Sequence, residues 1–460
     1  MEKKFRKYLK KSLVTSLVLV VMILSTIIPV WAQELSSPDF SPWAIWTLHE
    51  GERYGIFPTS WYFSHFRAGI TEERLNSLLE ATGEKIAALG LDKKEGFVPL
   101  PYKGDRSRGD VLTRLYNILA QYEIPVGESP IQYMQEQKII QGTGRGLELD
   151  RTCTTEEAVV FAIRLIQSLC DNLQASSKGF AWKLEHNNNT IYFLGSIHIG
   201  TSDLYPIDKK LREAFQEADA LIVEANLLDQ EDGIEYFLDK ARYQDGSTLK
   251  DNVSEETYEK LLKVFEIYGI PEEAYNQFKP WSVANDLTVL SSSRSENLQE
   301  AAEAATLGID IYFITTATLL DKPIGELEGI RYQADLLDGM SAEFQEIYLN
   351  AVLDSILEPP ADEAVDSAEL LEEWLDQWRK GDVEGFANSY TTTGKESENE
   401  MTSILFGQRD KDMADKIIEI LEGEEGKSYF VVVGAGHFVG DNSLFYHLEE
   451  RGYKLERLEY

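Results

Sequence analysis

Two histidines and one glutamate stand where the residues of a metal or catalytic site commonly stand. His198 and His437 each follow a glycine by three residues, at the end of an apolar segment, and Glu224 ends a third apolar segment. Imidazole nitrogen and carboxylate oxygen together bind divalent metals that activate water and polarise carbonyl or phosphoryl oxygens. The pattern therefore indicates metal-assisted chemistry. The alternative for a histidine after a strand is a hydrogen-bonded structural residue.

The segments that carry these residues alternate between strand and helix patterns. Residues 190–224 predict strand, loop, helix and strand, which is a βαβ unit, and residues 429–459 predict a second such unit. Parallel strands of βαβ units end at one edge of the sheet, where ligands bind. We therefore expect His198, Glu224 and His437 to face a common crevice.

The remaining segments of this region predict a strand hairpin over residues 180–194 and a helix, strand and helix over residues 308–337. The predicted fold class is α/β (α+β), with a central mixed sheet flanked by helices and preceded by a small helical region. The predicted domains are a signal peptide over residues 1–32, the helical region over 38–175 and the main domain over 178–460.

The two histidine segments, FLGSIHIGTSDLYP and FVVVGAGHFVGDNS, resemble the two ends of the TraB/GumN family, which includes the Tiki-type metalloproteases. That family is similar in fold to erythromycin esterases and ChaN-like haem-binding proteins. The resemblance extends to the stretches GIDIYF, PIGELE and RDKDMA. It implies that His198, Glu224 and His437 ligate a divalent metal (Mn, Co or Zn), with Glu224 as ligand or general base. It also implies that Glu328 and Arg409 orient a peptide or small ester substrate.

Two of these residues leave alternatives open. Glu328 could pair with Arg331 or cap a helix instead. The family commonly has Arg-Asn where this chain has Arg409-Asp410, which changes the local charge, although Arg409 could still bind a substrate carboxylate or an oxyanion. We expect Asp310, in the GIDIYF stretch, to be structural.

The helical region resembles S-layer homology modules of bacterial surface proteins. The segment YMQEQKIIQGTGRGLELDRTCTTEEAVVFAIRLI carries most of the resemblance, and HEGERYGIFP with FRAGITEERLNSLL forms a partial earlier copy. Such anchors usually have three copies, whereas two are recognisable here. The resemblance implies binding of a cell-wall polymer, and the alternative is a helical platform for the main domain.

The first 32 residues have the composition of a signal peptide. Basic residues precede an apolar stretch, and a Val-Trp-Ala sequence ending at Ala32 offers a cleavage site. We expect a secreted or cell-wall-associated protein without a membrane span after cleavage, and an uncleaved anchor is the alternative.

The bulk composition excludes some classes of function. A net charge of −35 argues against a nucleic-acid partner. The two cysteines, Cys153 and Cys170, bracket a helical pattern and are expected to be buried thiols. Neither an HExxH helix nor a Gly-x-Ser-x-Gly elbow occurs in the sequence. The predicted function is an exported metal-dependent hydrolase, and the alternative is a non-catalytic surface protein that binds a peptide or haem-like ligand.

Overall fold

The computed structural model describes residues 38–142, 144–228, 231–358, 366–394, 407–423 and 426–459, so the predicted signal peptide lies outside the described residues. The chain divides into two compact units. The larger contains Lys178–Thr201 and Lys210–Tyr460, and the smaller contains Val30–Ser177 and Ser202–Lys209. No described helix combines the length and apolar character of a membrane span.

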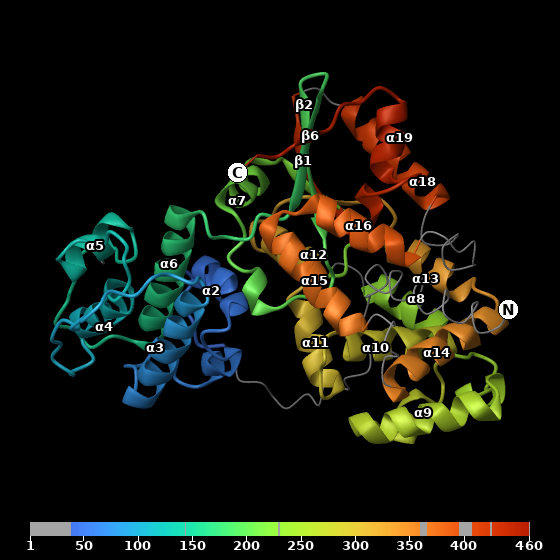
Figure 1. Cartoon of the computed structure of the whole chain (residues 1–460), viewed down its shortest axis with the longest axis horizontal. Helices are drawn as coiled ribbons and strands as arrows, with labels where there is room; N and C mark the ends of the chain where they lie inside the picture. Colours follow the sequence, from blue (N-terminus) through green and yellow to red (C-terminus); the bar gives the residue numbers. More distant parts are fainter. Residues whose placement is uncertain are drawn as a thin grey trace. The chain divides into compact units, whose positions relative to one another are not determined.

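The larger unit is built on one mixed sheet of six strands, ordered β4-β3-β5-β2-β1-β6. Strand β1 runs antiparallel to both of its neighbours, and the other described pairings are parallel. A tight turn joins β1 to β2, with Asn187 and Asn188 in the left-handed region that hairpin turns require (Figure 1). The strands are β1 Phe180–His186, β2 Asn189–Ser196, β3 Ala220–Val223, β4 Ile324–Glu326, β5 Ser428–Gly434 and β6 Glu456–Arg457.

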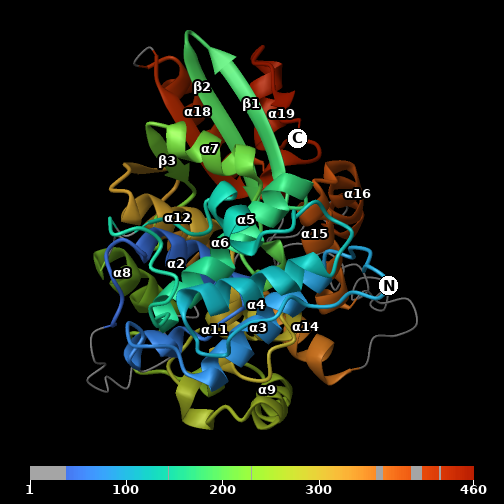
Figure 2. The same cartoon turned by 90° about the vertical axis from the view of Figure 1, so that its left-hand side faces the viewer.

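Helices cover both faces of this sheet. On one face, Phe193 and Val431 of the strands pack with Met413 and Leu448 from helices α18 (Gln408–Leu421) and α19 (Leu444–Glu450), which flank the β1–β2 hairpin in Figure 2. On the other face, Phe430 contacts aromatic rings of α7 (Lys209–Glu217) and α12 (Ile309–Leu319). Burial of these side chains holds the strand ends in place, and the predicted α/β fold class is confirmed.

The larger unit also contains a group of helices that pack mainly on one another. Helix α10 is buried almost throughout and packs on α14, which in turn packs on α9 (Figure 1). The further helices of the larger unit are α8 Glu231–Ala241, α9 Glu255–Tyr268, α10 Pro280–Ser292, α11 Leu298–Thr306, α13 Ile330–Asp338, α14 Ala342–Leu357, α15 Ser367–Lys380 and α16 Val383–Gly394, with short 3-10 turns η5 Leu249–Asn252, η6 Glu272–Tyr275 and η7 Ala435–Phe438.

The smaller unit is helical, and three of its helices start side by side. Thr71, Ser107 and Thr154 each accept a backbone hydrogen bond as the N-cap of α3, α4 and α6. Backbone bridges of Gly69 with Thr154 and of Ser107 with Thr152 join the three starts. Two of these starts lie in the segments FRAGITEERLNSLL and CTTEEAVVFAIRLI, which resemble S-layer homology modules, and the third is at Ser107. The helices are α2 Ile45–Gly51, α3 Glu72–Ala87, α4 Arg108–Ala120, α5 Pro130–Glu136 and α6 Thr155–Leu173, with η2 Glu52–Tyr54, η3 Thr59–Phe63 and η4 Ser202–Leu204.

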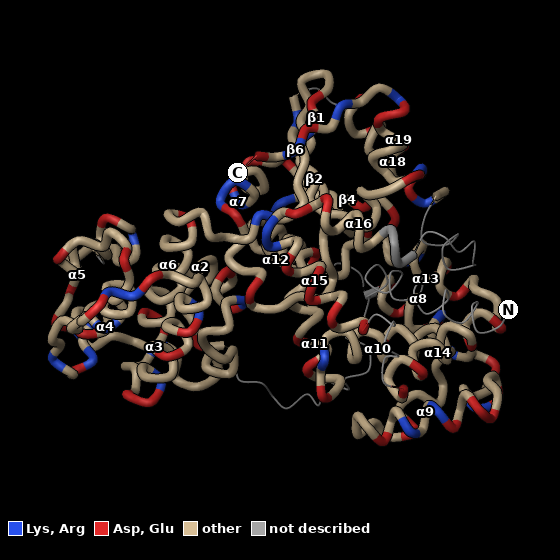
Figure 3. The backbone as a smooth tube through the Cα atoms, in the orientation of Figure 1, with Lys and Arg blue, Asp and Glu red and all other residues tan. Residues whose placement is uncertain are grey.

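Two further sequence expectations can be compared with the structure. Cys153 and Cys170 are both buried, as predicted. The acidic residues behind the net charge of −35 are spread along both units and are interspersed with Lys and Arg (Figure 3). Among the described residues the negative charge is therefore distributed along both units and is not concentrated in one segment.

Candidate active site

The ends of four parallel strands meet at the carboxyl edge of the sheet. In the β2–β5 register Ser196 lies opposite Gly434, and in the β3 pairings Val223 lies opposite Val432 and Glu326. The loops that follow these strands carry the predicted site residues His198, Glu224, Glu328 and His437. The edge therefore gathers them from segments more than 200 residues apart in the chain.

Glycine at position 195 lets the two histidine loops pack directly on each other. A β-carbon at this position would lie 3.1 Å from the Ala435 Cα and 3.2 Å from the Ala435 Cβ, closer than side chains normally pack. The Trp378 indole N–H also donates to the Gly195 carbonyl at 2.7 Å. The first motif glycine is thus explained by the close approach of two backbones.

His198 is held by an aspartate from α12. Its Nδ1 lies 2.6 Å from Asp310 Oδ2, and the Ser196 hydroxyl donates to Asp310 Oδ1 at 2.7 Å. Burial alone would lower the pKa of His198, but Asp310 and, more weakly, Glu224 outweigh burial and raise it. Among the described residues the His198 Nε2 is buried and has no hydrogen-bond partner, so this nitrogen is the one presented for chemistry.

His437 is held in the same way by α18. Its Nδ1 lies 2.8 Å from Asp410 Oδ1, and Asp410 Oδ2 accepts the Gly407 backbone N–H at 3.1 Å. The side chains of His437 and Asp410 are 0% and 1% exposed. Each motif histidine is therefore bonded through Nδ1 to an aspartate in the first turn of a helix.

Glu224 lies between these pairs in a bridge with Arg409 and Glu328. Its Oε1 accepts the Gly434 N–H at 2.7 Å, and its Oε2 accepts Arg409 Nη2 at 2.7 Å and Gln333 Nε2 at 3.3 Å. Arg409 also donates through Nε and Nη2 to the two oxygens of Glu328. All three charged side chains are at most 5% exposed.

The electrostatics of this bridge keep Glu224 ionised. Burial alone would raise the pKa of Glu224, but Arg409, then His437 and His198, outweigh burial and lower it. Both histidines are thus close enough to Glu224 to lower its pKa. Burial would lower the pKa of Arg409, but Glu328 and Glu224 raise it, so the guanidinium stays charged.

The structure therefore places all five predicted site residues in one region. Glu328 bonds Arg409 instead of Arg331, and Asp410 bonds His437. The sequence predicted Asp310 to be structural and did not indicate the contacts made by Gln333, five residues after Glu328, or by Tyr390, which comes from the distant helix α16. Position in the first turn of a helix was the available signal for the two aspartates.

Tyr390 of α16 completes the surroundings of the second histidine motif. Its side chain is 1% exposed, and its hydroxyl lies 2.2 Å from the point that a Gly436 β-carbon would occupy. Burial, and then Asp410, raises the pKa of Tyr390 well above its ordinary value, so that the phenol keeps its proton.

The residue types suit a divalent metal. Histidines that bind metals usually donate Nδ1–H to a carboxylate, which leaves Nε2 as the ligand, and both motif histidines have this arrangement. Glu224, however, accepts an arginine, an amide and a backbone N–H. Among the described residues no three His, Cys, Asp or Glu side chains form a ready cluster for an ion. A metal held by both histidines and Glu224 therefore requires the Arg409 bridge to rearrange.

The fold and the site define an α/β protein with a histidine- and carboxylate-lined site at the carboxyl edge of its sheet. The chain belongs to the TraB/PrgY/gumN family, which it matches over residues 180–457. The resemblance drawn from the two histidine motifs is thereby confirmed.

Relatives fall into two groups. Over 257 residues, 56% of this chain and 87% of the relative, the chain is 26% identical to the uncharacterized protein YbaP of Escherichia coli. It is 23% identical over 338 residues to a metalloprotease TIKI homolog of Amphimedon queenslandica and 22% identical over 315 residues to metalloprotease TIKI1 of Xenopus tropicalis. These matches cover 63% and 61% of the two TIKI proteins, less than two thirds of their length. No solved structure matches the chain significantly.

Proposed function

We propose that this protein is an exported, metal-dependent hydrolase that cleaves a peptide or ester bond at the cluster around Glu224. The observation that carries the proposal is the pair of histidines, His437 buried and His198 largely buried, each bonded through Nδ1 to an aspartate and each lowering the pKa of Glu224. The relatives named metalloprotease TIKI support a peptide substrate. The basic and apolar composition of residues 1–32 supports export.

Each residue of the cluster has a role in this proposal. His198 and His437 would hold Mn, Co or Zn through Nε2, and the bound ion would lower the pKa of a water molecule and polarise the substrate carbonyl. Glu224 is a third ligand or the base that takes the proton of water. Arg409 and Glu328 orient the substrate, and Arg409 releases Glu224 when Glu224 becomes a metal ligand.

Hydrolysis by the full chain tests the proposal. The metal-stripped protein is supplied with Mn²⁺, Co²⁺ or Zn²⁺ and assayed on p-nitrophenyl acetate and on a quenched-fluorescence peptide library. We expect turnover that needs the metal and falls at least about 100-fold in Glu224→Gln and His198→Ala, because each removes a ligand or a base. His447→Ala, outside the cluster, is the matched control. Binding of peptide or haem without turnover would contradict the proposal and favour a non-catalytic surface protein.

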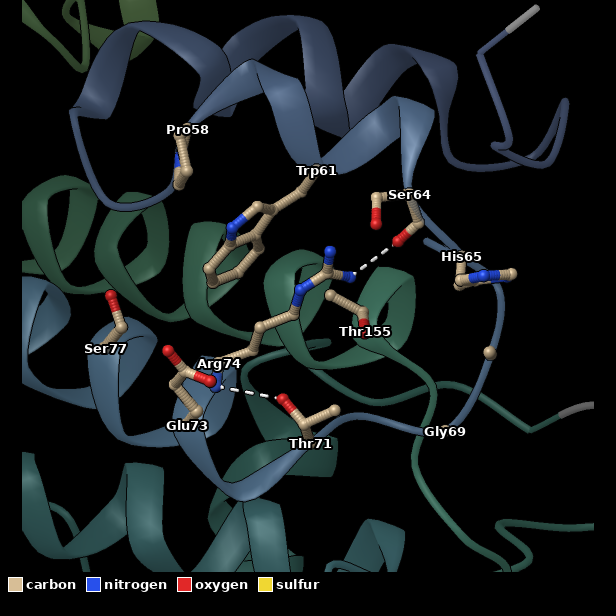
Figure 4. A pocket seen from close by; sticks show the side chains of 11 residues that line it. Pro58, Trp61, Ser64, His65, Gly69, Thr71, Glu73, Arg74, Ser77 and Thr155 are labelled. Atoms are coloured by element: carbon tan, nitrogen blue, oxygen red, sulfur yellow. Dashed lines mark hydrogen bonds between the residues drawn. The ribbon is translucent and has the colours of Figure 1, made fainter. Parts of the chain in front are cut away.

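The smaller unit supports a second candidate function, binding of a cell-wall polymer. A cavity of about 600 Å³ lies beside the start of α3, and Figure 4 shows the Trp61 indole and the Arg74 guanidinium inside it. The Arg74 guanidinium carbon lies 5.1 Å from the Trp61 ring centroid, and Arg74 Nη1 donates to the Ser64 carbonyl at 2.8 Å. The other polar residues of the lining are Ser64, His65, Thr71, Ser77 and Thr155, together with the acidic Glu73 next to Arg74.

Aromatic faces pack on sugar rings, and a guanidinium pairs with acidic substituents, so this cavity suits an acidic polysaccharide. Pull-down of the full chain with purified cell-wall polymer tests it. We expect retention that is lost in Trp61→Ala and Arg74→Ala. Arg114, which lies at the same 5.1 Å from the Tyr102 ring, supplies the control variant Arg114→Ala. Equal retention of all variants would leave the smaller unit as a helical platform.

A further inference from the structure

Several hydrogen-bond donors beside Glu224 already bind the carboxylates of the cluster. Arg409 donates to Glu328 and Glu224, Gln333 donates to both, and the Gly434 N–H donates to Glu224. Hydrolysis of an amide or ester, however, places negative charge on the carbonyl oxygen in the transition state. A preorganised donor for that oxygen is one of the largest contributions to catalysis. A donor in addition to the metal and Arg409 would therefore strengthen catalysis at this cluster.

Tyr390 brings a hydroxyl to the second histidine motif. Its oxygen lies over Gly436, next to His437, at a point that any side chain on residue 436 would occupy. The charged groups that act most strongly on the phenol are Asp410, Arg409 and Glu224, which are members of the same cluster. The Tyr390 hydroxyl therefore lies against the second histidine motif and within electrostatic reach of the Glu224 cluster.

The ring that carries this hydroxyl is rigidly held. Its centroid lies 5.2 Å from the Phe386 ring in a stacked arrangement and 5.6 Å from the Trp374 ring. Trp374 is fixed in turn by a hydrogen bond from its indole N–H to the Ser389 hydroxyl at 3.0 Å. Packing of this kind keeps the donor in one position, which an oxyanion donor requires.

We propose that Tyr390 is a further catalytic residue, whose hydroxyl donates a hydrogen bond to the carbonyl oxygen of the bond that is cleaved. This inference rests on the proposed hydrolase function. Water adds to the carbonyl carbon and gives a proton to a carboxylate of the cluster, while the π electron pair moves onto the carbonyl oxygen. The carbonyl then re-forms, the bond to the leaving nitrogen or oxygen breaks, and the carboxylate returns the proton to the leaving group. Tyr390 keeps its own proton throughout.

The variant Tyr390→Phe removes the hydroxyl and retains the ring. Tyr348→Phe is the matched control, because Tyr348 is also 1% exposed and its hydroxyl donates to Asn285 on α10, outside the cluster. Both variants of the full chain are assayed with Mn²⁺, Co²⁺ or Zn²⁺ on p-nitrophenyl acetate and the peptide library. Bound metal and the melting temperature are measured on the same samples.

We expect kcat of Tyr390→Phe to fall about 100-fold, with KM, bound metal and melting temperature close to those of Tyr348→Phe. A kcat within about twofold of wild type would overturn the role of Tyr390 and leave the hydrolase proposal standing. Loss of metal, or melting far below the control, would show that the hydroxyl is structural and would also overturn it. Absence of turnover in the wild type itself would remove the hydrolase proposal and this inference together.

Discussion

At the scale of single residues, the aspartates bonded to the two histidines decide which ring nitrogen is available. Asp310 and Asp410 each accept from Nδ1, so the neutral imidazole carries its proton there and Nε2 has the lone pair. These contacts are the clearest sign that the histidines are arranged for ligand binding. Asp410 thus gives His437 a carboxylate partner.

Removing that charge should weaken metal binding. We expect Asp410→Asn and Asp310→Asn to lower the affinity for Mn²⁺ or Zn²⁺ about 10- to 100-fold, because loss of a carboxylate behind a ligating histidine makes the ring less basic and less well oriented. Calorimetric titration of the metal measures this. Asp412→Asn, on an exposed position of the same helix α18, is the control. Unchanged affinity in both variants would show that the aspartates serve only to pack the helices.

Asp286 makes a separate prediction about stability and pH. Burial raises its pKa from 3.8 to about 8, against a hydrogen bond from Tyr275 that lowers it. Between these two values the unfolded chain has lost this proton and the folded chain has kept it. The free energy of unfolding therefore falls as the pH rises through this window.

The neutral variant Asp286→Asn should remove that dependence. At pH 7 we expect it to raise the free energy of unfolding by as much as roughly 4 kcal/mol, since each pKa unit corresponds to about 1.4 kcal/mol. Urea unfolding of both proteins at several pH values between 4 and 8 is the measurement. Parallel pH profiles for wild type and variant would contradict the assignment.

At the scale of secondary structure, one turn of α18 serves two parts of the site. Adjacent residues Arg409 and Asp410 reach the Glu224–Glu328 bridge and His437 respectively. The start of α12 positions the first histidine motif. The Ile309 N–H donates to the Ile197 carbonyl at 3.1 Å, and this contact brings Asp310 to His198. The two helix starts are therefore as much a part of the site as the strand ends.

The contribution of the Arg409 bridge to stability can be tested by removing its charges one at a time. We expect Arg409→Met to lower the free energy of unfolding by about 3–5 kcal/mol, because it leaves Glu224 and Glu328 buried without their cation. The double variant with Glu328→Gln should recover part of this loss, since one of the two uncompensated charges is gone. Urea unfolding of the single and double variants measures both effects. A double variant less stable than Arg409→Met would rule out this account of the bridge.

At the scale of the whole molecule, strand and helix periodicity was enough to predict the sheet and the convergence of three residues at its edge. Parallel strands must end at one edge, so His198, Glu224 and His437 could be placed together without knowing the strand order. The partners of the histidines could not be predicted from the sequence, because Asp310 lies 112 residues from His198 and no local pattern links them. The helix start at Ser107 was missed because its Ser-Arg-Gly-Asp sequence lacks the Thr-x-Glu-Glu pattern of the start at Thr154.

The most direct test of the account is the metal stoichiometry of the full chain. Metal-stripped wild type, His198→Ala, His437→Ala and the control His447→Ala are equilibrated with Mn²⁺, Co²⁺ or Zn²⁺, and bound metal is measured by elemental analysis. We predict about one ion per chain in the wild type and the control, and loss of that ion in both motif variants, because both histidines ligate it. No bound metal in the wild type, or retention by either motif variant, would contradict a shared metal site.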